Sequence, residues 1–379
     1  MSAFNRSLDT QFIILGFPDL HGVHGLFFAL LSIIYGFILS GNVLVITLIC
    51  THHHLHVPLY IFVAILSFLE IWYTGVTVPK MLLNLLNNKT ISYVGCLLQI
   101  YFLHCLGITE TYLLTAMAYD RYLAICNPLR YPSIMTYSNC FHLAACCWIV
   151  GLFGPLTQII LLSQLSFCGS KMIEHIFCDF TPLMNLACSD TSLNVTVDFS
   201  INFFLFFLAF ICIIMSYIKI ISAVLKIKTS EGWRKAFSTC GAHLTVVLLF
   251  FGSVGFMYVR LNSNNSVNYD RVMAVIYSVL TPMCNPIIYS LRNFEIREIL
   301  RKKIIKGPLI VGRCGCQPNV GSAPYAKYSS FPLPCTLGSL RLYISSLVRQ
   351  YKQISRWLSK RNAVYFFTEL SSGKFLHDL

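Results

Sequence analysis

Charged residues are scarce in this sequence. Asp, Glu, Lys and Arg make up 11% of its 379 residues, whereas about 25% is usual in soluble globular chains. Acidic residues are the rarer kind, at 15 against 28 Lys and Arg, so the net charge is +13. The length would allow two or three soluble domains. A chain that is 56% hydrophobic and so poor in charge is instead typical of a protein that crosses a membrane repeatedly.

The sequence also lacks the motifs of common enzyme classes. It has no glycine-rich phosphate loop, no nucleophile elbow and no zinc-ligand spacing, so we expect no enzymatic activity. His52, His53, His54 and His56 lie close together without cysteine or acidic support, and we interpret them as a solvated loop rather than a metal site. The N-terminal residues do not follow the pattern of a cleaved signal peptide, so the first apolar span is expected to direct insertion.

Seven windows of roughly 20 or more mostly apolar residues are long enough to span a bilayer as helices. They are residues 25–50, 58–83, 95–125, 140–162, 199–225, 236–259 and 272–291. The windows are too long for strands and show no alternation of apolar and polar residues, which argues against a β-barrel. The sequence therefore predicts an all-α membrane protein, a bundle of seven transmembrane helices.

The basic residues indicate which side of the bundle faces the cytosol. If the N-terminus is outside, the inner segments hold Arg121, Arg130, Lys226, Lys228, Arg234, Lys235, Arg297, Arg301, Lys302, Lys303 and Lys306. The outer segments then hold only Arg6, Lys89, Lys171, Arg260 and Arg271. Because cytoplasmic loops carry the excess of Lys and Arg, we expect the N-terminus outside and the C-terminus inside. The inner basic residues can meet anionic membrane lipids, so the positive net charge does not indicate nucleic-acid binding.

The spans divide the chain into four parts. We predict an extracellular tail at 1–24, the bundle at 25–291, a short amphipathic inner helix at 292–306 and a cytoplasmic tail at 307–379. The composition of the last part favours an irregular tail, and a basic amphipathic helix at 340–360 is the alternative.

Four N-x-S/T sequons lie on predicted outer segments, at Asn5, Asn88, Asn194 and Asn264. Distance from the bilayer favours Asn5 as the glycosylation site, because the other three lie close to helix ends.

The segment MAYDRYLAICNPLRY at 117–131 closes the third span. Its Asp120-Arg121-Tyr122 triplet lies where hydrocarbon gives way to cytosol, and charges there are costly unless they are paired or functional. Arg121 alone can be interpreted as a charge that snorkels to the interface. The adjacent Asp120 favours an ion pair that fixes the inner end of the helix and, once broken, frees the guanidinium for a cytosolic partner.

Several segments together resemble the olfactory receptors, a group of rhodopsin-like G-protein-coupled receptors. They are GN at 41–42, LHVPLY at 55–60, MAYDRYLAICNPLRY at 117–131, SY at 216–217, KAFSTCGAHL at 235–244 and PMCNPIIYSLRN at 282–293. The resemblance implies a plasma-membrane receptor for a small, mostly apolar odorant, coupled to a stimulatory heterotrimeric G protein that raises cyclic AMP. Two alternatives are a receptor-like chain that does not signal and a transporter, although no internal repeat favours the latter.

The resemblance also implies a G-protein switch. Its members are Asp120, Arg121, Tyr122, Tyr217, Asn285, Pro286 and Tyr289. Tyr217 and Tyr289, on the fifth and seventh helices, are the implied partners of Arg121. Pro286 lets the seventh helix bend, because proline removes a backbone donor and clashes with the preceding turn.

Glu70 and Glu110 are acids within predicted spans, and each would be costly if it faced lipid. The resemblance places Glu70 and Asn285 at a sodium site with Glu110 beside them, although Glu70 stands where Asp is commoner. Two carboxylates in a dry site cannot both stay ionised without a cation. A sodium ion and a protonated, hydrogen-bonded pair both remain open, and no other cofactor is expected.

The sixteen cysteines need two interpretations. Within the spans we expect small buried hydrophobic residues at Cys105, Cys146, Cys147 and Cys212. Cys96, Cys168, Cys178 and Cys188 lie on the oxidising outer side, where four cysteines allow three pairings. The resemblance implies that Cys96 pairs with Cys178 and Cys168 with Cys188.

The ligand pocket is less sharply marked. On the third span His104, Gly107, Ile108 and Thr111 share one face, and Gly107 leaves room beside the backbone. Other candidate lining residues are Asn202, Leu205, Phe206, Phe251, Gly255, Tyr258, Val275 and Ser278. The set is mostly apolar with a few polar groups, as in small-molecule sites, and ordinary helix packing is the alternative for each residue. The outer half of the third span has no acid, which counts against an amine ligand.

Overall fold

The computed structural model describes residues 11–18, 22–168, 170–226, 230–258, 267–291, 296–299 and 301, without the side chains of 230–239, 256–258, 267–268 and 290–291. The chain forms two compact units, Met1–Asn293 and Phe294–Leu379. In the second unit, residues 296–299 and 301 are helical, within the inner helix predicted at 292–306. Asn5 and the predicted tail at 307–379 lie outside the described residues.

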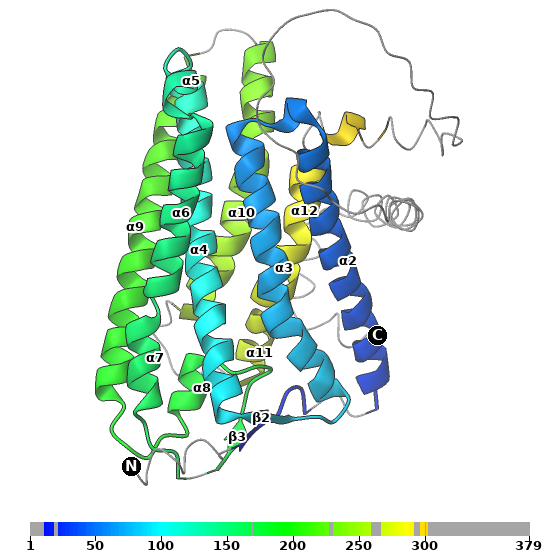
Figure 1. The fold of residues 1–379 in the computed structure, drawn as a ribbon, viewed down its shortest axis with the longest axis vertical. Coiled ribbons are helices and arrows are strands. Elements are labelled where there is room, and N and C mark those ends of the chain that lie inside the picture. Colours follow the sequence, from blue (N-terminus) through cyan, green and yellow to red (C-terminus); the bar gives the residue numbers. More distant parts are fainter. Residues whose placement is uncertain are drawn as a thin grey trace, which may run out of the picture. The chain divides into compact units, whose positions relative to one another are not determined.

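Long helices running side by side build the first unit (Figure 1). They are α2 (His24–Thr51), α3 (Pro58–Leu85), α4 (Tyr93–Cys126), α6 (Tyr137–Phe153) with α7 (Leu156–Ser163), α9 (Ser192–Val224), α10 (Ser230–Tyr258), and α11 (Val267–Val275) with α12 (Thr281–Leu291). Six spans in the described part of the chain are long and apolar enough to cross a membrane, and α10 contains a shorter apolar segment, Cys240–Gly255. The predicted helical membrane fold is confirmed.

Local sequence explains where several helices begin. Pro58 opens α3, a position where its missing N–H costs nothing. The Ser92 hydroxyl accepts a hydrogen bond from the Gly95 N–H at 3.1 Å and caps α4. Thr136 caps α6 in the same way through the Asn139 N–H at 3.3 Å. Such caps satisfy backbone donors that the first turn of a helix leaves without a partner.

Two of the predicted spans are interrupted. The window at 140–162 contains the break between α6 and α7, at Gly154 and Pro155, because proline cannot continue the hydrogen-bond ladder. The window at 272–291 contains a π-helix, Ile276–Leu280, between α11 and α12. Such π-helical turns are frequent at functional sites. Pro286 lies inside α12, and a Cβ atom added at Gly41 would lie 3.3 Å from its ring, so α2 and α12 pack closely there.

A small sheet covers one end of the bundle. Strand β1 (Gln11–Ile14) pairs antiparallel with β2 (Thr90–Ser92) and parallel with β3 (Met172–Ile173), in the order β2-β1-β3. The outer tail predicted at 1–24 therefore contains a strand that we did not predict. Phe12 and Ile14 are fully buried, and burial of such side chains is worth about 1.5–3 kcal/mol each.

Both disulfides lie at the same end. Cys96 of α4 is bonded to Cys178, and Cys168 is bonded to Cys188. The short helix α8 (Phe180–Met184) follows Cys178 and lies at the end that carries β2 and β3, opposite the end with α5 (Tyr131–Ile134) (Figure 1). An apolar cluster joins these segments. It contains Phe12, Ile14, Tyr93, Cys96, Ile100, Leu162, Leu165, Ile173, Cys178, Phe180, Leu183 and Met184.

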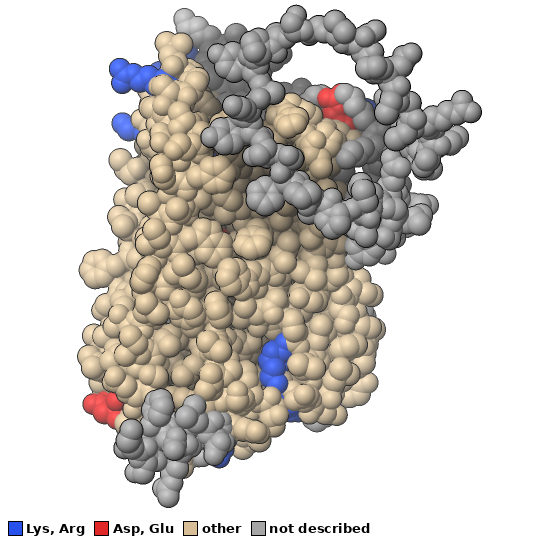
Figure 2. All heavy atoms as spheres, viewed as in Figure 1, with Lys and Arg blue, Asp and Glu red and all other residues tan. Residues whose placement is uncertain are grey.

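The lateral surface of the bundle, along the sides of its helices, carries many exposed apolar side chains. Figure 2 shows one face on which the coloured, charged side chains lie toward the two ends. Cys105 and Cys147 are buried as predicted, but Cys146 and Cys212 are exposed. The prediction was wrong for these two because a helix that faces hydrocarbon can place apolar residues on its outer side.

Candidate functional site

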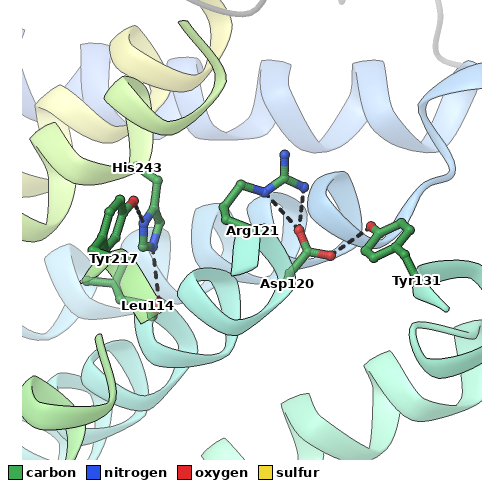
Figure 3. A network of polar contacts seen from close by, with 6 residues as sticks. All are labelled: Leu114, Asp120, Arg121, Tyr131, Tyr217 and His243. Atoms are coloured by element: carbon green, nitrogen blue, oxygen red, sulfur yellow. Dashed lines mark hydrogen bonds and ion pairs between the residues drawn. The ribbon is translucent and has the colours of Figure 1, made fainter. Parts of the chain in front are cut away.

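The Asp120-Arg121 pair lies buried near the C-terminal end of α4, at 0% and 7% exposure. The Arg121 Nε donates to Asp120 Oδ2 at 2.9 Å, and its Nη2 contacts the same oxygen. The hydroxyl of Tyr131, the first residue of α5, donates to Asp120 Oδ1 at 2.8 Å (Figure 3). Both carboxylate oxygens of Asp120 are therefore hydrogen-bonded, Oδ2 to Arg121 and Oδ1 to Tyr131.

Tyr217 of α9 and His243 of α10 form a second group (Figure 3). The Tyr217 hydroxyl lies 2.7 Å from His243 Nδ1, and His243 Nε2 lies 3.1 Å from the Leu114 carbonyl oxygen of α4. Because a carbonyl can only accept, Nε2 carries the hydrogen, and Nδ1 accepts from the tyrosine. The group connects α9, α10 and α4, and it holds the Tyr217 hydroxyl, which was expected to meet Arg121.

His243 and Tyr131 were not predicted as members of this site. Both lie in segments that resemble olfactory receptors, but neither was given a role. A signal was available for His243, because an ionisable residue inside an apolar window needs a partner. Of the other predicted switch residues, Tyr122 accepts a hydrogen bond from Asn127 at 3.4 Å, and Tyr289 is buried at 7% exposure.

The structure brings Glu70, Glu110 and Asn285 together from α3, α4 and α12. The Asn285 amide donates to Glu70 Oε1, and a side-chain hydrogen bond joins the two carboxyl groups. Glu70 Oε2, Glu110 Oε1 and Asn285 Oδ1 are buried without a partner among the described residues. Three such oxygens are the donor type that a hard cation takes. The described residues contain no group of three or more His, Cys, Asp and Glu side chains that could hold a metal ion.

The candidate pocket residues of α4 are all buried, but they do not all border open space. A Cβ atom added at Gly107 would lie 2.8 Å from the Tyr277 hydroxyl, so Tyr277 takes up the room that we assigned to a ligand. Thr111 donates to the Gly107 carbonyl at 2.8 Å, and Ser278 donates to the Ala274 carbonyl at 2.6 Å. Both hydroxyls are already satisfied by a backbone carbonyl four residues earlier.

An aromatic contact joins α9 and α10 in the candidate pocket region. The rings of Phe206 and Phe251 have centroids 5.0 Å apart. Leu205 lies beside Phe206, and its carbonyl accepts from Tyr112 at 3.3 Å. A Cβ atom added at Gly255 would meet no described atom within 4 Å. Val275 ends α11, and the Tyr258 side chain lies outside the described residues.

The loop that carries both disulfides is anchored by buried polar contacts. His175 is 2% exposed, and its Nδ1 donates to the Phe177 carbonyl at 3.1 Å. Burial lowers the pKa of His175, an effect that the Asp179 carboxylate opposes. The His175 carbonyl accepts from the Gly16 N–H at 3.0 Å, and the Ile176 carbonyl accepts from Asn84 at 3.3 Å. The loop is thereby connected to the N-terminal segment and to α3.

Comparison with known proteins gives a consistent result. The model of the olfactory receptor family matches residues 31–306. Human Olfactory receptor 6N1 is 55% identical over 305 residues, which are 80% of this chain and 98% of that protein. Human Olfactory receptor 6K6 is 50% identical over 297 residues, 78% of this chain and 86% of that protein. Mouse Olfactory receptor 6B9 is 44% identical over 299 residues, 79% of this chain and 95% of that protein.

Proposed function

Because the chain belongs to the olfactory receptor family, and is thus a multi-pass receptor of the plasma membrane rather than an enzyme, we propose how it works. It binds a small odorant in the outer half of its bundle. It then activates a stimulatory heterotrimeric G protein at the inner face and raises cyclic AMP. The observation that carries this proposal is the buried group formed by Asp120, Arg121 and Tyr131 beside the Tyr217–His243 pair.

We propose that the N-terminus is outside and the C-terminus inside. The excess of Lys and Arg on the opposite segments supports this orientation, and so do the two disulfides, which need an oxidising side. The same orientation divides the chain into an outer tail at 1–24, the bundle at 25–291, an inner amphipathic helix at 292–306 and a cytoplasmic tail at 307–379. It also leaves Asn5 on the side where glycosylation occurs.

In this proposal the described arrangement is the resting state of the switch. Asp120 holds the Arg121 guanidinium, and His243 holds the Tyr217 hydroxyl, so neither group is available to a G protein or to the other. Removing one member of a buried ion pair costs about 3–5 kcal/mol, so spontaneous release of Arg121 is rare. An odorant shifts the equilibrium only by the difference between its affinities for the two states. The π-helix and Pro286 are places where the seventh helix can adjust.

Glu70, Glu110 and Asn285 would hold a sodium ion in the resting state. The ion would supply the positive charge that lets both carboxyl groups ionise. Without it, one carboxyl group keeps a proton and donates the hydrogen bond that joins the pair.

A cyclic AMP reporter assay with a panel of odorants tests the proposal. The wild-type receptor should give a dose-dependent rise, and Arg121→Ala should abolish it at matched surface expression. Arg130→Ala is the control, because it removes a neighbouring basic side chain that has no contact with Asp120 among the described residues. A chain that does not signal would give no rise with any odorant, and a transporter would accumulate a labelled ligand instead. A full response from Arg121→Ala would refute the switch.

A further inference from the structure

A polar cluster of one buried and two half-buried side chains lies in the outer half of the bundle, away from the switch. Asp198 of α9 accepts two hydrogen bonds at Oδ1, from Gln158 Nε2 of α7 at 2.9 Å and from Asn202 Nδ2 at 2.9 Å. Of these residues, only Asn202 was predicted as part of a ligand site. A carboxylate has about four acceptor positions on its two oxygens, so these two donors leave much of its capacity unused.

The surroundings of Asp198 offer little positive charge. Among the described residues no Lys or Arg forms an ion pair with Asp198, and the charged groups that act on its carboxyl group are His104 of α4 and Asp179. Asp179 is the N-cap of α8, the outer-loop helix whose Phe180 ring lies 6.4 Å from the His104 ring. Asp198 and its two hydrogen-bond partners thus lie between α7 and α9, and one imidazole and one further carboxyl group act on it electrostatically.

Gln158 supplies a second, independent observation. Its side chain is 2% exposed, and its Oε1 has no hydrogen-bond partner among the described residues. A buried acceptor without a partner destabilises the fold, because it has lost its hydrogen bonds to water. Both this oxygen and the carboxylate of Asp198 therefore favour a ligand that brings hydrogen-bond donors.

The cluster continues into an apolar region. Asp198, Asn202 and Phe206 follow one another at four-residue spacing and so share one face of α9. The Phe206 ring in turn contacts Phe251 of α10, at a centroid distance of 5.0 Å. A ligand that reaches from Asp198 to Phe206 would meet acceptors at one end and aromatic carbon at the other.

We propose that this receptor recognises small protonated amines with a hydrocarbon body. The ammonium group, which has three donors and no acceptor, pairs with Asp198 and donates to Gln158 Oε1, while the hydrocarbon lies against Phe206 and Phe251. The inference rests on the proposed function, since it names the ligand class of that receptor. It also replaces the expectation drawn from the third helix, because the acid lies on the fifth.

Matched ligands test the charge. Hexylamine and hexanol have the same chain length, but only the amine is cationic at neutral pH. In the cyclic AMP assay hexylamine should activate the wild type, and Asp198→Asn should raise its half-maximal concentration at least about ten-fold. The response to hexanol should not change, and Asp198→Glu should keep most of the amine response. Asp190→Asn is the control, because it removes an exposed outer carboxylate that contacts Ser192 and not this cluster.

Equal losses for amine and alcohol in Asp198→Asn would overturn the proposal, because Asp198 would then only support the fold or pair with His104.

Direct binding separates this proposal from the proposed function. Hexylamine should raise the melting temperature of the purified full-length receptor in lipid nanodiscs, and Asp198→Asn should abolish the shift. A shift without any cyclic AMP rise would keep the amine site and reject the signalling proposal. No shift in the wild type would overturn the amine site.

Discussion

Replacing His243 by Leu should raise the activity of the receptor in the absence of ligand. The imidazole is 1% exposed and makes two hydrogen bonds, to the Tyr217 hydroxyl at 2.7 Å and to the Leu114 carbonyl at 3.1 Å. Leucine fills a similar volume and makes neither. Because a hydrogen bond contributes about 0.5–1.5 kcal/mol net, losing both should destabilise the resting arrangement by about 1–3 kcal/mol.

That free energy corresponds to a shift of about 5- to 150-fold in the equilibrium between the two states. The assay is ligand-free cyclic AMP at matched surface expression, where His243→Leu should exceed the wild type several-fold. His142→Leu is the matched control, because His142 is exposed on α6. Adding Tyr217→Phe should cancel the rise, since the freed hydroxyl would no longer be there to meet Arg121. Unchanged basal activity in His243→Leu, or a rise that survives Tyr217→Phe, would refute the reasoning.

Three further predictions concern the loop between α7 and α9 and the pair Glu70 and Glu110. Cys96→Ser and Cys178→Ser should each impair delivery of the receptor to the cell surface, because losing a native disulfide costs about 2–5 kcal/mol in small secreted domains. The double variant should be no worse than either single variant, since both substitutions remove the same bond. Normal surface delivery of both single variants would count against a role for the bond. Burial lowers the pKa of His175, so below about pH 6.5 the unfolded chain binds a proton that the folded loop does not. The melting temperature of the receptor should therefore fall as the pH is lowered from 7.5 to 5.5. An equal fall in His175→Asn would show that the effect does not come from His175. If a cation binds between Glu70 and Glu110, sodium should raise the melting temperature more than potassium does at equal ionic strength, and Glu110→Gln should abolish this difference. Equal effects of the two salts on the wild type would favour a protonated pair without a cation.

The helices could be predicted from the sequence because the bilayer leaves few choices. A backbone in hydrocarbon must satisfy its polar groups internally, so an apolar window of sufficient length becomes a helix. One of the two interruptions has a signal in the sequence, because Pro155 marks the break in the fourth span. The π-helix at Ile276–Leu280 had no comparable signal, because a π-turn depends on packing around it.

The three-stranded sheet β2-β1-β3 could not be predicted for a different reason. Its strands have four, three and two residues, too few for alternation to be recognised. Strand β1 also pairs with segments far along the chain, Thr90–Ser92 and Met172–Ile173. Such pairing is decided by which loops the bundle brings to one end, and a local pattern does not contain that information.

The polar sites likewise differ in whether their contacts join residues that are adjacent in the sequence or residues that are far apart. Asp120 and Arg121 are adjacent in the sequence, so their pairing could be predicted. Asp198 and Gln158 lie 40 residues apart, and their contact depends on how α7 and α9 are rotated. The sequence does identify each as a polar residue in or beside an apolar window, and such a residue must find a partner, a cation or a ligand. Deciding among these needs the structure, because a carboxylate that already has a cationic partner and one that still has acceptor capacity look the same in a sequence. Asp120 is of the first kind and Asp198 of the second, which is why one is assigned to the switch and the other to the ligand.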